Sequence, residues 1–107
     1  MKNSTHQALS ESTYYILLSL HTPQHGYGIM QFVKQLSNNR LTLAPGTLYG
    51  AITALLDKKW IEPKEKETTD RKKVYVITAL GQEALQTEIA RLAELYQNGL
   101  AITKGEE

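Results

Sequence analysis

The sequence predicts a mainly α-helical fold with one small antiparallel β-hairpin and a long helix at the C-terminal end. Two stretches predict this fold class. In the first, a Pro-Gly pair opens a helix with an apolar stripe, and the chain then becomes extended at Trp60-Ile61. In the second, a basic turn leads into a β-rich segment, Lys73 to Ile77, which ends where another helix begins. Helix, strand, turn and strand in this order is typical of a winged helix-turn-helix followed by a C-terminal helix.

Length and composition set the protein class. A chain of 107 residues with 41% hydrophobic residues suits one small globular unit. It contains no cysteine, which excludes disulfides and thiolate chemistry and fits a cytoplasmic protein. The polar start, Met1–Gln7, predicts no signal peptide, and the longest apolar run, Tyr14–Leu18, is too short to span a membrane. We expect residues 1–80 to form the winged helix-turn-helix, and residues 81–107 a dimerisation helix with a frayed tail.

Two helices are expected before the Pro-Gly pair. Ser10 is placed to cap the first, which should stop near Thr22-Pro23 because proline disfavours helix in the residue before it. The second should run from about Tyr27 to Leu36, since apolar residues recur there at helical spacing. Asn38 and its neighbours should end it, because asparagine tolerates the left-handed conformation. The alternating segment Arg40–Leu43 predicts a short strand.

The third helix, Pro45–Lys58, is the candidate for entering a DNA groove. At roughly 100° per residue, its side away from the apolar stripe carries small and uncharged residues. Thr47, Gly50 and Thr53 can approach bases or phosphates, and the hydroxyl of Tyr49 can reach a phosphate. With no Arg, Asn or Gln on that side, bidentate reading of bases is not expected from the helix centre.

Gly50 has two explanations at this stage. A glycine inside a helix is less stable than alanine by about 1 kcal/mol, so it usually has a packing or functional reason. It either lets DNA come close or makes room for a neighbouring protein element. Tyr49 has the same pair of explanations, phosphate contact or half-buried packing.

The hairpin supplies positive charge. Net charge is only +1 for the chain, but residues 58–73 hold seven basic and four acidic residues, a net of +3. Phosphate binding depends on such local charge. The candidate contacts in this region are Lys66, Arg71, Lys72 and Lys73. A mixed-sign run of this kind is also common in a simple solvated hairpin.

The last helix predicts a dimer. Thr78 is placed to cap it, and Leu85, Ile89, Leu92 and Tyr96 follow at spacings of four, three and four. This heptad-like seam is expected to pair with its copy in a homodimer.

Four short motifs carry a family resemblance: Gly26–Ile29, Pro45–Tyr49, Arg71–Tyr75 and Ile77–Gly81. Together they resemble the PadR family of winged helix-turn-helix transcriptional regulators, over roughly residues 9–95. The short length is similar to the subfamily with a single C-terminal helix.

The resemblance implies a homodimer that binds a two-fold DNA operator, acts mostly as a repressor, and often responds to phenolic, drug-like or stress signals. It also implies DNA contacts by Thr47, Tyr49, Gly50 and Arg71–Lys73. The sequence departs from the family at Lys59, where glycine is common at the helix exit. Because a left-handed lysine is less stable than glycine there, we expect the helix to continue for one residue. The acidic residues Glu67 and Asp70 also depart from a purely basic wing.

Other chemistry is sparse. His21 and His25 are separated by a proline and lack a nearby carboxylate, so no metal site is expected. Trp60 and Tyr96 are candidate contacts for a small aromatic effector, although packing explains either of them. No catalytic constellation or phosphate loop is visible, so neither an enzyme nor a cofactor is expected.

The sequence therefore predicts a DNA-binding transcriptional regulator, a repressor acting as a homodimer. One alternative is a winged-helix protein-interaction module that does not bind DNA, favoured by the near-neutral charge. Another is a ligand sensor whose main output is effector capture.

Overall fold

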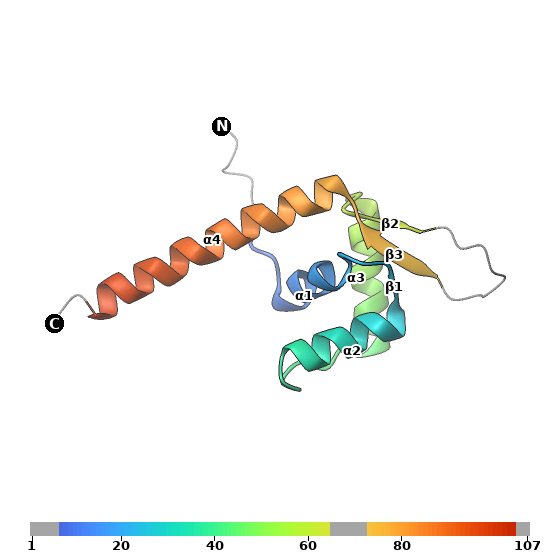
Figure 1. Cartoon of the computed structure of the whole chain (residues 1–107), viewed down its shortest axis with the longest axis horizontal. Helices are drawn as coiled ribbons and strands as arrows, with labels where there is room; N and C mark the ends of the chain where they lie inside the picture. The colour runs from blue at the N-terminus through green and yellow to red at the C-terminus, as the bar shows by residue number, and fades with distance from the viewer. Residues whose placement is uncertain (1–6, 65–72, 105–107) are drawn as a thin grey trace.

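The computed structural model of the chain describes residues 7–64 and 73–104, and its elements follow the predicted order (Figure 1). Three helices come first, with a two-residue strand between the first pair, and a hairpin and a long helix follow. The elements are α1 Glu11–Ser19, β1 Gln24–His25, α2 Gly26–Leu36, α3 Pro45–Asp57, β2 Ile61–Pro63, β3 Val74–Ile77 and α4 Ala79–Lys104. The mainly helical winged helix-turn-helix is thereby confirmed. Of the expected tail, Lys104 is helical, and the rest lies outside the described residues.

The core lies between the first three helices, the sheet and the start of α4. α1 and its C-cap are its centre, because Ile16 and Leu17 on the helix and Leu20 at the cap are completely buried. α2 and α3 each contribute one apolar stripe at helical spacing, and Leu85 closes the core from α4. Such burial supplies most of the stability of a small domain.

The sheet contains a strand that the sequence analysis missed. Its order is β1-β3-β2, with Gln24 opposite Tyr75 and Ile61 opposite Ile77, both pairings antiparallel. The strand expected at Arg40–Leu43 is wrong, since that segment is irregular. The outer edge of β3 is paired with Gln24–His25 instead, and Leu43 is buried in the core.

The helix ends test three predictions made from local sequence signals. Ser10 caps α1 by accepting a hydrogen bond from the Thr13 amide at 3.0 Å, as predicted. Asn38 and Asn39 end α2 in the left-handed region with φ of 58° and 66°, also as predicted. The expectation for Lys59 is wrong, because the helix stops at Asp57 and Lys59 has φ of 65°.

Lys59 is held in this conformation by backbone hydrogen bonds. Its amide donates to the Leu56 carbonyl at 3.0 Å, and the Trp60 amide donates to the Leu55 carbonyl at 3.1 Å. This pair of bonds defines a Schellman motif, in which the residue past the helix end is left-handed and is usually glycine. The motif turns the chain from the end of α3 into β2. This change of direction allows Ile61, on β2, to be buried in the core.

α3, β2 and α4 meet at one junction. The Trp60 carbonyl accepts from the Thr78 amide at 2.9 Å. The Thr78 hydroxyl donates to the Lys59 carbonyl at 2.8 Å and accepts from the Gly81 amide at 3.0 Å, so Thr78 caps α4 as predicted. A Cβ on Gly81 would lie 2.1 Å from the Trp60 carbonyl oxygen, so only glycine permits this approach.

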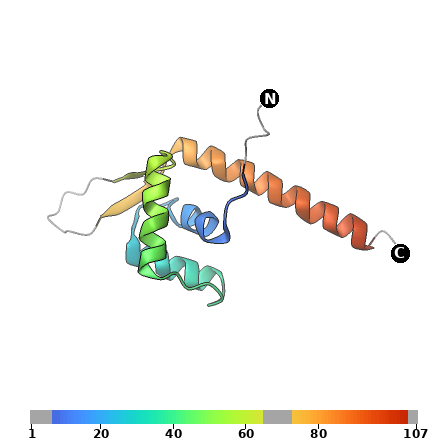
Figure 2. The ribbon, with the colours of Figure 1, turned by 180° about the vertical axis from the view of Figure 1, so that it is seen from behind.

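α4 extends well beyond the rest of the fold. Its 26 residues correspond to about 39 Å of helix, and its C-terminal half projects away from α1, α2 and α3 (Figures 1 and 2). Neither α4 nor any other helix within residues 7–64 and 73–104 combines the length and apolar character needed to cross a membrane.

Replacing Lys59 by glycine should stabilise the fold. A left-handed L-residue is less stable by about 1–2 kcal/mol, and the extra chain entropy of glycine in the unfolded state offsets part of the gain. We expect Lys59→Gly to raise the free energy of unfolding by about 0.5–1 kcal/mol, measured by urea denaturation. The matched control is Lys58→Gly, because Lys58 has an ordinary helical φ of −80° and should lose stability. Equal stability of Lys59→Gly and the parent chain would contradict the strain.

Candidate nucleic-acid interface

The side of α3 away from the core is open to solvent. Gly46, Thr47, Gly50 and Thr53 are all exposed, and this set is called the α3 face below. Leu48, on the opposite side of the helix, is completely buried. Figure 2 shows α3 at the surface of the fold, with the hairpin strands beside it. The helical spacing therefore identified the exposed side correctly.

The two glycines of the α3 face contact no other part of the described chain. A Cβ built on Gly50 meets nothing within 4 Å, and the same holds for Gly46. Within residues 7–64 and 73–104, Gly50 therefore makes room for no neighbouring protein element. What remains is a helix surface that another molecule can approach to backbone distance.

Some of the hydrogen-bonding groups on α3 already have a partner within the helix. The Thr53 hydroxyl donates to the Tyr49 carbonyl at 3.0 Å, so toward a ligand it offers its acceptor oxygen and its methyl group. At the start of α3, Ala44 provides no side-chain cap and Pro45 occupies the first turn. The first amides of α3 therefore point outward without a side-chain acceptor, in the arrangement that helix N-termini use for phosphates.

The surroundings of Tyr49 fit in part each of its two predicted roles, phosphate contact and half-buried packing. It is 49% exposed, and its hydroxyl is positioned against the start of α2, where a Cβ on Gly26 would lie only 2.2 Å away. Tyr75, which is 7% exposed, lies nearby on β3. Burial raises the pKa of the Tyr75 phenol, with a smaller contribution from Tyr49. With its pKa raised, the Tyr75 phenol is a neutral hydrogen-bonding group near neutral pH.

The base of the hairpin presents two lysines. Lys64 and Lys73 are exposed, and the Lys64 amide donates to the Val74 carbonyl at 2.7 Å, which continues the pairing of β2 with β3. The remaining predicted wing contacts, Lys66, Arg71 and Lys72, lie outside the described residues.

A polar surface on α2 was not identified from the sequence. Tyr27 is 63% exposed, and Gln31 donates from its side-chain amide to the Tyr27 hydroxyl at 2.8 Å. Lys34, exposed, follows one turn later. These residues lie three and four positions apart, opposite the buried Ile29, so the helical spacing used for α3 would have found them. In helix-turn-helix proteins the helix before the recognition helix crosses the phosphate backbone.

The predicted seam of α4 divides into a buried and an exposed part. Leu85 is only 1% exposed and belongs to the chain's own core, so its expected place in a dimer interface is corrected. Beyond it the seam is exposed, and its residues together with the neighbouring Leu95 are called the α4 stripe below. The stripe consists of Ile89 (37% exposed), Leu92 (37%), Leu95 (53%) and Tyr96 (64%).

One buried ion pair lies beside the α4 stripe. Glu88 is 1% exposed, and its two carboxylate oxygens accept from Arg91 at 2.9 and 2.6 Å. The Glu88 carboxylate raises the pKa of the Arg91 guanidinium, so Arg91 stays charged. Glu88, the last buried residue of α4, is thus paired with Arg91 one turn later, and the exposed stripe begins beside it.

The two histidines considered as metal ligands have local roles. His25 caps α2, because its Nδ1 accepts from the Gly28 amide at 3.3 Å. His21 Nδ1 lies 3.3 Å from the Leu18 carbonyl at the end of α1.

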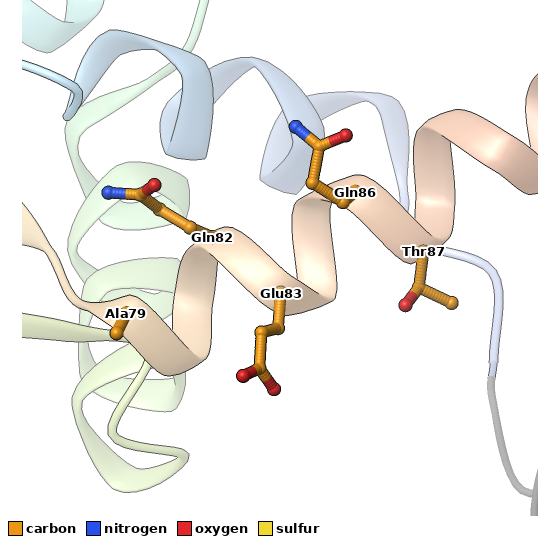
Figure 3. A pocket seen from close by; sticks show the side chains of 5 residues that line it. All are labelled: Ala79, Gln82, Glu83, Gln86 and Thr87. Carbon is orange, nitrogen blue, oxygen red and sulfur yellow. The ribbon is translucent and has the colours of Figure 1, made fainter.

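A shallow hollow on the outer side of α4 does not suit DNA. It is lined from a single helix by Ala79, Gln82, Glu83, Gln86 and Thr87 (Figure 3). The side chains of Gln82 and Gln86 extend to one side, and those of Glu83 and Thr87 to the other. These five residues include a carboxylate and no basic group, so the hollow would repel phosphates.

Comparison with known proteins assigns the chain to a family. The model of the transcriptional regulator PadR-like family matches residues 6–87. The chain belongs to this family. The match covers the winged helix-turn-helix and the first turns of α4, and it confirms the resemblance carried by the four sequence motifs. PadR-like proteins are transcriptional regulators and not enzymes.

Two relatives are similar in sequence. The chain is 37% identical over 73 residues to a 37.1 kDa protein of transposon TN4556 from Streptomyces fradiae, covering 68% of the chain and 20% of that protein. The chain thus spans about a fifth of the length of that relative. It is 30% identical over 91 residues to protein X of Lysinibacillus sphaericus, covering 78% of the chain and 84% of that protein.

Solved structures agree in fold. A PadR-like transcription factor from Bacteroides fragilis is similar with a TM-score of 0.70 and 30% identity, covering 84% of this chain and 87% of that one. BpsR from Bordetella bronchiseptica, whose DNA binding is regulated by 6-hydroxynicotinic acid, is similar with a TM-score of 0.66. It covers 94% of this chain and 69% of that one, but at 14% identity it shows a shared fold alone.

Proposed function

We propose that the chain is a repressor that binds a two-fold DNA operator as a homodimer in the cytoplasm. The single observation that carries the DNA-binding proposal is the open α3 face, with two glycines that contact no described protein element. Membership of a family of transcriptional regulators supports it. In this proposal residues 1–80 are the DNA-binding unit and residues 81–107 the dimerisation unit.

Contacts to DNA would be divided between three surfaces. The α3 face enters the major groove and approaches the bases through Thr47, Gly50 and Thr53. Tyr49 contacts a phosphate with its hydroxyl, and the basic wing residues Lys66, Arg71, Lys72 and Lys73 lie along the backbone or in the minor groove. The wing would supply most of the electrostatic affinity, because α3 carries no basic residue before its C-cap Lys58.

Dimerisation follows from the exposed apolar residues of α4. Contiguous apolar surface on a projecting helix is a common mark of a protein interface. Pairing of two α4 stripes would bury Ile89, Leu92 and Tyr96 and join two copies of α3 in one dimer. Across the two-fold axis Tyr96 would face its copy.

A small aromatic effector is an additional partner in this proposal. Trp60 and Tyr96 are its candidate contacts, and they belong to separate parts of the fold. Gly81 touches the Trp60 carbonyl, and Tyr96 lies 15 residues further along α4, or about 22 Å of helix. Regulation of BpsR by an aromatic acid supports the idea that this fold can respond to such a compound.

Gly50→Ala should separate stability from DNA binding. The methyl group meets no described protein atom, so we expect a gain of about 1 kcal/mol in the free energy of unfolding. The same methyl would stand between α3 and DNA, and affinity should fall by about tenfold, equivalent to roughly 1.4 kcal/mol. Denaturation and gel-shift on the chain's own promoter measure the two effects. Gly81→Ala is the control for position, since its Cβ collides with the Trp60 carbonyl and should destabilise the fold. Unchanged DNA affinity of Gly50→Ala would remove the α3 face from the interface.

Removing charge from the wing should weaken binding to every DNA sequence. For Arg71→Ala with Lys72→Ala we expect lower affinity at each salt concentration. The slope of log affinity against log salt should decrease by about 1.8, because each basic side chain that pairs with a phosphate contributes about 0.9 to it. Lys104→Ala at the far end of α4 is the control and should leave the slope unchanged. An unaltered slope in the double variant would exclude the wing. No binding to any DNA by the parent chain would favour the protein-interaction module.

A charge in the α4 stripe should dissociate the dimer. We expect Leu92→Glu to be a folded monomer by analytical ultracentrifugation and circular dichroism, because pairing would bury two carboxylates on the axis. Leu80→Glu is a matched control, since Leu80 is 48% exposed on the same helix but lies outside the stripe. A dimer that tolerates Leu92→Glu would place the interface elsewhere.

A further inference from the structure

We infer that the α3 face recognises the C5-methyl group of thymine in the major groove of DNA. The inference rests on the proposed function, since it names the chemical group that a DNA-binding α3 reads. Gly50 is the centre of this contact, and Thr47 and Thr53 lie about one turn before it and one turn after it. All three residues are exposed. Bare backbone thus lies between two threonines on the open side of the helix.

The Thr53 side chain is held in one orientation. Its hydroxyl donates to the Tyr49 carbonyl at 3.0 Å. This bond uses the one proton of the hydroxyl and fixes the rotamer of a side chain that is already restricted by branching at Cβ. Thr53 therefore has no hydrogen left to donate to a base. It offers a methyl group in a fixed position and an acceptor oxygen.

The space beside Gly50 is open to a group of methyl size. A Cβ built on Gly50 meets nothing within 4 Å in the described chain. A carbon atom at that place would have to come from another molecule. A methyl group on a base edge would contact the Gly50 backbone and the Thr53 methyl together, at the separation where carbon atoms attract each other most.

The chemistry of this surface favours thymine over the other bases. From Thr47 to Thr53 the sequence contains no Lys, Arg, Asn or Gln. A guanine edge, which presents two acceptors, would lose its water here without a bidentate partner. The thymine methyl is apolar and gains from leaving water. Asp57, the only charged residue of α3, is seven positions after Gly50, or about 10 Å along the helix axis.

The consequence for the operator is a thymine·adenine pair opposite the centre of α3 in each half-site. The thymine contact carries no charge, so the preference for thymine is expected to be the same at every salt concentration. Binding through the basic wing, by contrast, weakens as salt rises. The α3 contact therefore adds specificity at a fixed base pair, while the wing adds affinity to every sequence.

Deoxyuridine is the probe, because it pairs as thymidine does and lacks only the methyl group. Gel-shift of the full-length chain compares its own promoter with the same DNA in which uracil replaces every thymine, and single replacements then locate the contact. Affinity should fall by about fourfold for each methyl group contacted, the factor expected when one buried carbon group is removed. Equal affinity for the two DNAs would overturn the inference and leave the proposed regulator intact. Absence of binding to any DNA would overturn both.

Two variants of Thr53 separate its methyl group from its hydroxyl. Thr53→Ser keeps a hydroxyl that can donate to Tyr49 but lacks the methyl, so it should bind thymine and uracil DNA with nearly equal affinity. Thr53→Val keeps a methyl and lacks the hydroxyl, so it should retain the preference of about fourfold for thymine. The reverse pattern would assign the contact to the oxygen atom and overturn the inference.

Thr103→Ser on α4 is the matched control. Thr103 is exposed, and its hydroxyl donates to the Gly99 carbonyl at 2.8 Å, four residues earlier, as that of Thr53 does to Tyr49. This variant should keep the preference of the parent chain for thymine. The comparison also accounts for any change that uracil makes to DNA stiffness, because such an effect would persist in Thr53→Ser. Full preference for thymine in Thr53→Ser would therefore overturn the inference.

Discussion

The close contact between Gly81 and the Trp60 carbonyl is the constraint on which the arrangement of the functional elements depends. α3 ends there, β2 begins there, and α4 starts there. Thr78 joins all three, because its amide donates to Trp60 while its hydroxyl links Lys59 to Gly81. A side chain on Gly81 would separate α4 from the end of α3. The angle between the exposed α3 face and the projecting α4 is therefore set by a few backbone contacts at one point.

The parts of the fold that depend on near neighbours were predictable, and those that depend on distant ones were not. The cap at Ser10 and the left-handed end at Asn38 follow from residues within one helical turn. β1 consists of two residues without alternation, and it forms because the edge of β3 pairs with it. For Lys59, intrinsic preference favours a continued helix, but the burial of Ile61 and the Schellman hydrogen bonds override that preference.

The same distinction applies to the candidate sites. Helical spacing predicted the α3 face because a buried stripe determines the opposite, exposed side. It could not locate the boundary of the expected dimer seam, since Leu85 and Leu92 are seven residues apart and occupy equivalent positions of one repeat. Only the packing of α1 against the first turns of α4 places Leu85 in the core and leaves Leu92 at the surface. The role of Gly50 likewise required the structure, because open space beside a glycine has no sequence signal.

The composition of α3 determines how this protein would distinguish operators. A helix face of glycines and threonines permits close approach but provides no bidentate donor and acceptor pair for a base edge. Discrimination would then depend on thymine methyl contacts, on DNA shape and on the separation of the two half-sites. In the proposed dimer, that separation would be set by the path from the α4 stripe through the Gly81 contact to α3.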